Sequence, residues 1–286
     1  MSTCEPVPCR LCEGEATFLF ERKILRKYEI KYYECKDCGS LQTEEPYWLN
    51  EAYADQRRVL DVGAAMRVDR LRTLTSLLFH ILKFDSGTKL LDWGGGDGLF
   101  VRMLRDSGLQ AYHWDTYSEN MYGAGFDRDP GEHYDFITSF EVFEHLPYPK
   151  QEIEKMFSGS PRAFFATTEI YARQGADWIY LNVLSGRHVF FYSRKAISLI
   201  AEKYGYRSEI FPTRYILFYR HPLSRITILW IRILARLNNN RRLSSLLRIL
   251  LPQNSLTSAD KEYTTKAVEQ GELWPDQKLT QSTDKS

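Results

Sequence analysis

Two pairs of cysteines near the amino terminus have the spacing of a metal site. Cys9-x-x-Cys12 and Cys35-x-x-Cys38 are separated by the 22 residues from Glu13 to Glu34. Four thiolates arranged in this way bind Zn²⁺ tetrahedrally, and so short a segment buries too little apolar area to fold without such support. Residues 1–45 are therefore predicted to form a zinc ribbon with a structural zinc ion. Cys4 lies outside the pattern and is interpreted as a free thiol.

A glycine-rich loop follows a short apolar strand further along the chain. Lys89-Leu90-Leu91 leads into Asp92-x-Gly94-x-Gly96-x-Gly98, after which a helix is expected from Leu99. Glycine lets a backbone turn sharply and approach a ligand closely. The last glycine is spaced differently from that of dinucleotide-binding loops, and similar strings also occur in ordinary turns. The loop therefore indicates a ligand site only if other residues support it.

The spacing of this loop resembles motif I of class I S-adenosylmethionine (SAM)-dependent methyltransferases. The resemblance implies that Gly94 and Gly96 pass beneath the methionine and ribose parts of the cofactor, with Gly98 closing the loop. It also implies that Asp92 faces the amino group of SAM. Because SAM carries a sulfonium and an ammonium group, an acidic residue in the loop is electrostatically favourable.

A second acidic residue, Asp115, ends the next predicted strand. It lies roughly 20 residues beyond the glycine loop, where a carboxylate of this fold class pairs with the two hydroxyls of a ribose. The alternative is an aspartate that serves only a surface turn. Together with the glycine loop, Asp115 favours a cofactor site.

A third segment, Glu141-Val142-Phe143-Glu144-His145, follows the strand that ends at Phe140. Many small-molecule methyltransferases have a similar E-V-x-E-H segment after their fourth strand, and this resemblance implies that Glu141 lies beside the cofactor. His145 is a candidate general base because an imidazole titrates near neutrality. The alternative is a histidine that caps a helix or supports a neighbour.

The expected substrate side is rich in aromatic and hydrogen-bonding residues. Residues 178–181 and 186–193 suit a sugar or another polar ring. His188 and Tyr192 are candidate proton acceptors, although His188 can instead cap a turn and Tyr192 can pack in the core. With residues 42–53, this region resembles methyltransferases of surface-polysaccharide and glycan biosynthesis, and the similarity covers most of residues 5–220.

These residues need a sheet to position them. Short apolar strands alternate with amphipathic helices, which is typical of a doubly wound α/β fold. The predicted strands are 89–92, 111–115, 136–140, 163–168, 208–211 and 215–219. We therefore predict a Rossmann-like, mostly parallel, seven-stranded sheet in residues 85–222, with the ribbon before it and a helical extension after it. Residues 46–84 are predicted to be a helical connector, with apolar residues such as Val59 and Leu71 at helix-like spacing.

The carboxyl-terminal part of the chain is basic. Between Ile210 and Ala259 there is no Asp or Glu, but there are eight arginines. Residues 223–252 are predicted to form amphipathic helices with Arg225, Arg232 and Arg236 along one stripe. Such helices can bind an anionic membrane surface through residues 223–251, or they can cover the main domain or a dimer partner. Residues 253–286 are predicted to be largely disordered.

The composition limits the functions to consider. The formal net charge is +1, with 43% hydrophobic and 26% charged residues, as in ordinary globular proteins. No signal peptide and no apolar run of the roughly 18 residues needed to span a bilayer is present, so we expect a cytoplasmic protein that can associate with the inner membrane surface.

The leading functional hypothesis is a methyltransferase acting on a hydroxyl of a sugar, nucleotide-sugar or surface-polysaccharide intermediate. One alternative is an RNA base methyltransferase that binds nucleic acid through the ribbon. The near-neutral charge and the lack of an Asn-Pro-Pro-Tyr-like string after the fourth strand disfavour nucleic acid as a partner. A second alternative is a non-catalytic protein that binds the cofactor and a partner.

Overall fold

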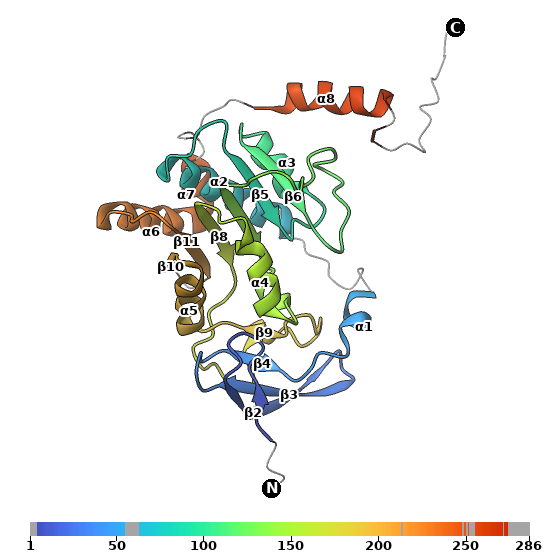
Figure 1. Ribbon diagram of the computed structural model, residues 1–286, viewed down its shortest axis with the longest axis vertical. Coiled ribbons are helices and arrows are strands. Elements are labelled where there is room, and N and C mark those ends of the chain that lie inside the picture. Colours follow the sequence, from blue (N-terminus) through green and yellow to red (C-terminus); the bar gives the residue numbers. More distant parts are fainter. Residues whose placement is uncertain are drawn as a thin grey trace.

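The computed structural model describes residues 5–54, 63–212, 214–247, 249, 251, 255–270 and 272–273. Several predictions concern residues outside this part. They are the predictions for Cys4, for Val59 and for residues 274–286. The described elements form two sheets with helices around the larger one (Figure 1).

The larger sheet has six strands in the order β10-β11-β8-β7-β5-β6. Its strands are β5 (Lys89–Trp93), β6 (Gln110–Trp114), β7 (Phe136–Phe140), β8 (Ala163–Thr167), β10 (Arg207–Phe211) and β11 (Tyr215–Tyr219). β6, β5, β7 and β8 are parallel, whereas β11 runs antiparallel to both β8 and β10. Each of the six predicted strands is present. The prediction of a Rossmann-like, mostly parallel sheet is confirmed.

The prediction of seven strands is wrong for the described residues. Beyond the outer edge of β6 the chain forms only an isolated parallel bridge between His113 and Asp127. The segment leading to this bridge contains Gly123 and Gly125, and Pro130 follows it closely. Glycine and proline weaken a strand, so the chain passes along the edge without extending the sheet.

Helices cover both faces of this sheet, giving three layers (Figure 1). α4 (Pro149–Ser158) and α5 (Arg194–Tyr204) share one apolar cluster with alternate strand residues such as Leu91. α2 (Ala64–Ile81), α3 (Leu99–Arg105) and α6 (Arg225–Asn239) share the other cluster with their strand neighbours, such as Leu90. Successive strand residues point to opposite faces, which is why strands buried on both sides are apolar throughout.

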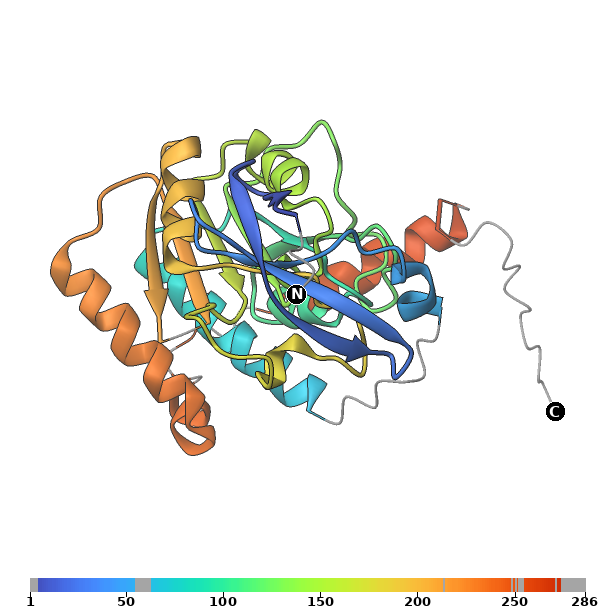
Figure 2. The ribbon, with the colours of Figure 1, turned by 90° about the horizontal axis from the view of Figure 1, so that it is seen from below.

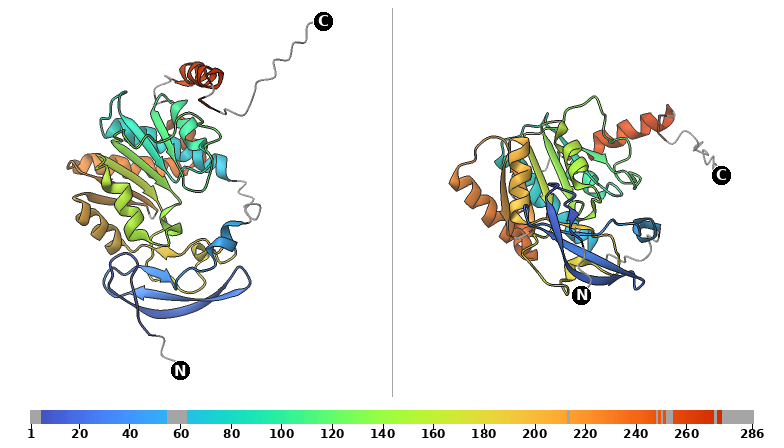
Figure 3. Two further views of the ribbon diagram at one scale, coloured as in Figure 1. Left: turned by 45° about the vertical axis from the view of Figure 1, so that its right-hand side comes forward. Right: turned by 60° about the horizontal axis from the view of Figure 1, so that its bottom comes forward.

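The amino-terminal segment forms most of the smaller sheet, and a strand from much later in the chain completes it. The strands are β1 (Val7–Pro8), β2 (Glu15–Ile24), β3 (Tyr28–Cys35), β4 (Leu41–Thr43) and β9 (Phe190–Phe191). β9 pairs with β4 through Leu41 opposite Phe191 and Gln42 opposite Phe190. Figure 3 shows this sheet below the larger one, and Figure 2 shows the long β2–β3 hairpin crossing the molecule from below. The predicted ribbon of residues 1–45 therefore shares its sheet with a strand from residues 190–191.

The connector contains two described helices, α1 (Leu49–Ala54) and α2, on either side of residues 55–62, which lie outside the described part. α2 packs in the core of the larger sheet through Leu71, Leu74 and Leu78. It therefore belongs to the main domain, whose predicted beginning at residue 85 is too late.

The prediction of a largely disordered segment after residue 253 is wrong for residues 257–269, which form α8 (Thr257–Glu269). Asp260 is buried and accepts two hydrogen bonds from Arg105, at 2.7 and 2.8 Å, and one from Arg102 at 2.8 Å. Burial opposes ionisation, but these two arginines outweigh it and lower the pKa of Asp260. Asp260 thus anchors α8 on α3. The polar composition of the segment that contains α8 does not reveal this contact.

α6 and α7 (Arg241–Leu247) have both a packed and an exposed face. Ile231 and Ala235 of α6 are buried against the main domain, and the Asn238 amide donates to the Arg70 carbonyl of α2 at 2.8 Å. On the other face, Ile226, Leu229 and Trp230 remain 69%, 57% and 57% exposed. Among the described helices, none has the length and apolar character needed to cross a membrane.

Candidate functional site

The glycine loop lies at the carboxyl end of β5, between its two parallel neighbours. Gly94, Gly96 and Gly98 all have positive φ, at 79°, 60° and 82°, which residues with a Cβ rarely adopt. A Cβ on Gly94 would lie 2.5 Å from Cγ2 of Val142, whereas a Cβ on Gly96 would meet no described atom within 4 Å. Gly94 therefore permits close packing on the segment after β7, and Gly96 borders open space in which a ligand can lie.

Asp92 is buried beneath this loop. Its Oδ1 accepts a hydrogen bond of 2.7 Å from the Thr138 hydroxyl of β7. Burial raises the pKa of Asp92 to about 7, although Thr138 and His113 oppose this shift. A buried carboxyl held near its titration point gains a full negative charge when a cation binds beside it. The position fits the predicted contact with a cationic ligand.

His113 of β6 supports the loop and was missed by the sequence analysis. Its Nε2 lies 2.9 Å from the carbonyl oxygen of Gly96, and its Nδ1 lies 3.4 Å from Oδ1 of Asp127. Burial lowers the pKa of His113, but Asp127, the Gly96 carbonyl and Asp92 outweigh burial and raise it. The sequence does offer a sign of this role, because His113 is a polar residue in a predicted strand that ends beside the loop.

Asp115 follows β6 directly and contacts the same loop. Its Oδ2 accepts from the Gly96 amide at 3.0 Å, while Oδ1 accepts from the amides of Tyr117 and Ser118 at 2.7 and 2.9 Å. Both interpretations of this residue therefore have a basis, because it shapes a turn and also lies at the loop. The structure brings Asp92, Gly96 and Asp115 together at one edge of the sheet.

The segment after β7 forms the opposite wall. Glu141 has a positive φ of 55°, and its carboxylate accepts from the Thr167 hydroxyl at 2.8 Å and faces Arg214 at 3.4 Å. The chain leaves β5 toward β6 on one side and returns to β7 on the other. A crevice for ligands forms outside the carboxyl ends of strands at such a point. Glu141 lies at the carboxyl end of β7, and its contact with a cofactor stays a prediction.

Two of the predicted catalytic residues meet beside this wall. His145 ends a short turn, η2 (Phe143–His145), and its ring centroid lies 4.8 Å from that of His188. Burial lowers the pKa of His145 to about 4 and also lowers that of His188, so both rings are neutral near pH 7.

Glu144, which the sequence analysis quoted without assigning it a role, completes this group. It is fully buried, and its Oε1 accepts a hydrogen bond of 2.7 Å from the hydroxyl of Tyr180. Burial, reinforced by Glu141, raises the pKa of Glu144 to about 7. The sequence shows Glu144 as a second acidic residue three positions after Glu141. Acidic residues are rarely buried unless they are paired, so its burial indicates a specific role.

Aromatic and cationic side chains link this group to the cofactor loop. The hydroxyl of Tyr53 lies 3.4 Å from Nδ1 of His145, and its ring stacks on Tyr117, with 5.7 Å between centroids. The guanidinium of Arg187 lies 5.0 Å from the centre of the Tyr53 ring. Since Tyr117 follows Asp115 closely, Tyr53 links the glycine-loop region to His145.

Tyr192 does not join the site. It is fully buried, packs on Phe143 with 5.4 Å between ring centroids, and donates to the Phe143 carbonyl at 3.1 Å. We correct its interpretation from proton acceptor to core residue, because its hydroxyl is buried and already bonded to a backbone carbonyl. The side chains of Phe191 and Tyr192 enter different apolar clusters, because successive residues of an extended chain point to opposite sides. The sequence analysis did not predict β9, so it did not predict this arrangement.

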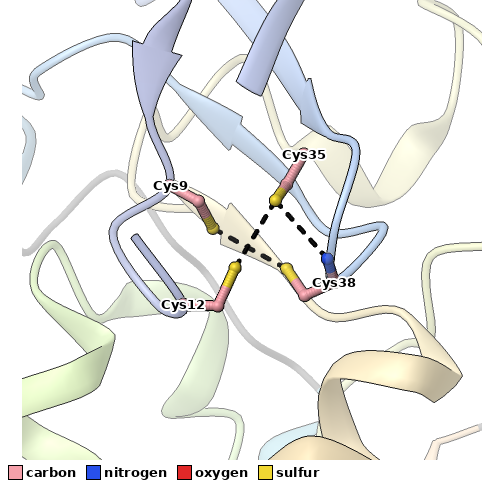
Figure 4. Close-up of side chains that lie close together, drawn as sticks. All are labelled: Cys9, Cys12, Cys35 and Cys38. Carbon is pink, nitrogen blue, oxygen red and sulfur yellow. Dashed lines mark hydrogen bonds between the residues drawn. The ribbon is translucent and has the colours of Figure 1, made fainter. Parts of the chain in front are cut away.

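The four predicted metal ligands converge where the turn after β1 meets the turn between β3 and β4 (Figure 4). The sulfur atoms of Cys9 and Cys38 lie 3.7 Å apart and those of Cys12 and Cys35 lie 3.5 Å apart, and all four cysteines are free thiols. A tetrahedron of Zn–S bonds of about 2.3 Å has edges of about 3.8 Å. The arrangement fits a zinc ion and is far from the roughly 2.0 Å of a disulfide.

The comparisons with known proteins identify the larger domain. A family described as a methyltransferase domain matches residues 64–209, just over half of the chain. The chain belongs to this methyltransferase family. The match contains the glycine loop, Asp115, the segment after β7 and both histidines of the site. The comparison with curated proteins gave no match.

Several solved methyltransferase structures resemble this methyltransferase. Human N-acetylserotonin methyltransferase with SAM is 14% identical, with 54% of this chain and 52% of that chain covered and a TM-score of 0.39. This chain thus spans about half the length of the human protein. Magnesium protoporphyrin IX methyltransferase from Synechocystis PCC 6803 with bound S-adenosylhomocysteine is 19% identical, covering 60% and 93%, with a TM-score of 0.41. The bacterial CtHen1-C methyltransferase domain is 18% identical, covering 54% and 98%, with a TM-score of 0.40.

Proposed function

We propose that this methyltransferase transfers a methyl group from SAM to a hydroxyl of a sugar, nucleotide-sugar or surface-polysaccharide intermediate. The observation that supports this most directly is the meeting of Asp92, Gly96 and Asp115 at the carboxyl ends of β5 and β6, inside the region that matches the family. Family membership supports methyl transfer, and the crevice supports a small polar acceptor.

The chain's own residues fit the donor. SAM supplies a methyl group on a positively charged sulfur, which the acceptor oxygen attacks as the C–S bond breaks and sulfur keeps the electron pair. Asp92 offers a buried negative charge for the ammonium group, and Asp115 offers a carboxylate for the ribose hydroxyls. Gly96 leaves space above the loop for the cofactor.

The acceptor side of the crevice is formed by Tyr53, Arg187 and the Glu144–His145–His188 group. Aromatic rings and a guanidinium suit a sugar, because rings stack on its apolar faces and charged groups bond its hydroxyls. The hydroxyl that accepts the methyl group must lose its proton as the new C–O bond forms. The Glu144–His145–His188 group is positioned to promote that loss.

Calorimetry tests the donor site. We expect the wild-type protein to bind SAM and S-adenosylhomocysteine, and Asp115→Ala to weaken binding by about 10- to 100-fold, the worth of a hydrogen bond to a charged group. Asp129→Ala is the matched control, because Asp129 is an exposed turn aspartate that accepts from the Gly131 amide. Absence of binding by the wild-type protein, or equal effects of both substitutions, would overturn the cofactor assignment.

A methyl-transfer screen with labelled SAM tests the acceptor. Sugars, nucleotide-sugars and RNA are offered in parallel to the full-length protein. We expect label in a sugar-containing product and none in RNA. Label in RNA alone would replace the proposed acceptor class with the nucleic-acid alternative.

We also propose that the exposed face of α6 binds an anionic membrane surface. Ile226, Leu229 and Trp230 are exposed within a stretch of sequence that has eight arginines and no acidic residue. This combination of apolar and basic residues is that of an interfacial helix. Such attachment would keep the enzyme near membrane-linked intermediates.

A further inference from the structure

Glu144, His145 and His188 form a compact group of metal-type ligands that is separate from the four cysteines. One nitrogen of each imidazole and one carboxylate oxygen of Glu144 all lie within 4.8 Å of one another. An ion with bonds of about 2.1 Å would draw these atoms somewhat closer, which small side-chain rotations allow. The group joins η2 to the segment that precedes β9.

Backbone carbonyls fix the protonation of both imidazoles. Nδ1 of His145 lies 3.1 Å from the carbonyl oxygen of Arg187, and Nδ1 of His188 lies 2.6 Å from that of Tyr180. A carbonyl can only accept, so each Nδ1 carries the proton and each Nε2 keeps its lone pair. Histidines that bind metals are oriented by the same type of bond from the second nitrogen.

The contact that would compete with a metal ion for the Nε2 lone pair of His188 is weak. Nε2 of His188 lies 3.5 Å from Nδ2 of Asn182, at the outer limit of a hydrogen bond. A metal ion would bind Nε2 far more strongly than this amide does. The imidazole of His188 is therefore oriented and available as a ligand.

Glu144 has an unsatisfied oxygen in the same place. The residue is fully buried and Tyr180 binds Oε1, but Oε2 accepts no hydrogen bond from any described residue. A buried carboxylate oxygen without a partner costs free energy, and a native structure keeps one only where something satisfies it. A cation held jointly with two imidazoles would do so.

We propose that Glu144, His145 and His188 bind a divalent transition-metal ion of the Mn²⁺, Fe²⁺ or Zn²⁺ type. Two imidazoles and one carboxylate are a ligand set that such ions accept, and three protein ligands leave coordination positions open. The four thiolates of the ribbon form a closed set by comparison. The described part of the chain would thus hold one closed and one open metal site.

The role of the ion rests on the proposed function. An open position beside the crevice can bind the acceptor oxygen, and a bound cation lowers the pKa of that hydroxyl. The hydroxyl proton passes to water, the oxygen forms its bond to the methyl carbon, and the sulfonium becomes a thioether. The ligand class is therefore a hydroxyl oxygen of the acceptor.

Titration with Mn²⁺ tests the site without any activity measurement. Full-length protein with its ribbon filled with zinc is titrated while electron paramagnetic resonance follows free Mn²⁺. We expect one Mn²⁺ to bind to each wild-type chain, and at least tenfold weaker binding by Glu144→Gln and by His188→Ala. His133→Gln is the matched control, because His133 is an exposed histidine that lies near Asp135. Unchanged Mn²⁺ affinity in both test variants would overturn the proposal.

Cobalt absorption gives a second test that needs no variant. Co²⁺ bound by four thiolates absorbs strongly by charge transfer from sulfur, whereas Co²⁺ bound by nitrogen and oxygen shows only weak ligand-field bands. We expect weak bands from a second Co²⁺ in wild-type protein whose ribbon already holds zinc. If no Co²⁺ binds to wild-type protein whose ribbon already holds zinc, the proposed metal site is wrong. This result does not depend on whether the variants fold.

Methyl transfer then separates this inference from the proposed function. Metal binding without methyl transfer to any acceptor would contradict the function and leave the site standing. Methyl transfer that is unaffected by a chelator, in protein that binds no second metal, would leave the function standing and contradict the metal site.

Discussion

At the scale of single residues, Asp92 makes cofactor binding sensitive to pH. Its pKa of about 7 means that the carboxyl is protonated in much of the unliganded protein at neutral pH. A cationic ligand needs the ionised form, so we expect SAM affinity to fall as pH decreases below about 7, approaching tenfold per pH unit. Calorimetry between about pH 8 and about pH 6 measures this dependence.

Two variants separate Asp92 from its neighbour in this measurement. Asp92→Asn should bind SAM weakly and with little dependence on pH, because the titrating group is gone. His113→Gln should keep the dependence with a shifted midpoint, since His113 favours the ionised form of Asp92. An unchanged pH dependence in Asp92→Asn would contradict the assignment.

The residues of the site differ in how far the sequence reveals them. Asp92 and Asp115 each end a predicted strand and Glu141 follows one, and parallel strands bring their carboxyl ends to one edge, so their meeting is predictable. The role of Glu144 is not, because its burial depends on Tyr180, 36 residues away. Tyr192 shows the reverse case, in which the residue type indicates chemistry but the surrounding core determines packing.

At the scale of elements, one buried ion pair attaches α8. We expect Asp260→Ala to destabilise the protein by about 3 kcal/mol, because Arg105 would stay buried without a carboxylate to balance its charge. Since the pKa of Asp260 is lowered, its contribution is present above the ordinary carboxyl pKa and is lost as pH falls below it. Thermal denaturation at neutral and acidic pH measures both effects.

An exposed acid on the same helix is the control for this measurement. Glu262→Ala removes a carboxylate whose partner among the described residues is Lys266, in an exposed (i, i+4) bridge. It should change stability by less than about 0.5 kcal/mol. Equal losses in the two variants would mean that the Asp260 pair does not hold α8 in place.

The exposed face of α6 gives a prediction for vesicle binding. Combined replacement of Ile226, Leu229 and Trp230 by serine should weaken binding to anionic vesicles by at least about tenfold, because it removes the large exposed apolar side chains of α6. Sedimentation with phosphatidylglycerol vesicles measures this, with neutral phosphatidylcholine vesicles in parallel. Leu19→Ser on β2, which alters a leucine that is 46% exposed, is the control and should bind normally. Equal binding by the triple variant and wild type would contradict the proposal.

The elements were predictable where local pattern determines them. The six strands of the larger sheet follow from apolar runs, and α6 follows from its amphipathic spacing. α8 and β9 were not predictable in this way, because each depends on a partner far away in the sequence: Arg105 for α8 and β4 for β9. Neither segment has a strong pattern of its own.

At the scale of the whole molecule, the ribbon and the methyltransferase domain should lose structure together. Cys9, Cys35 and Cys38 lie in the same apolar cluster as Phe164 and Phe218 of the larger sheet. We expect one zinc ion per wild-type chain at the ribbon, and Cys35→Ser should lose it and lower the melting temperature in a single transition. Metal analysis with calorimetric melting measures both quantities.

Cys4→Ser is the matched control for zinc content, because Cys4 lies outside the paired spacing. It should keep zinc and melt as the wild type does. Two separate transitions in Cys35→Ser, with the later one unchanged, would show that the ribbon unfolds independently of the domain.

The pairing of β9 with β4 also affects the order in which the protein can form during synthesis. The ribbon sheet begins at residue 7, but its last strand is residues 190–191, so the ribosome must make most of the methyltransferase domain first. Domains made early in translation usually fold before the rest of the chain appears. Here β1 to β4 and the four clustered cysteines are all made early, but the outer edge of β4 stays without its partner strand until β9 emerges.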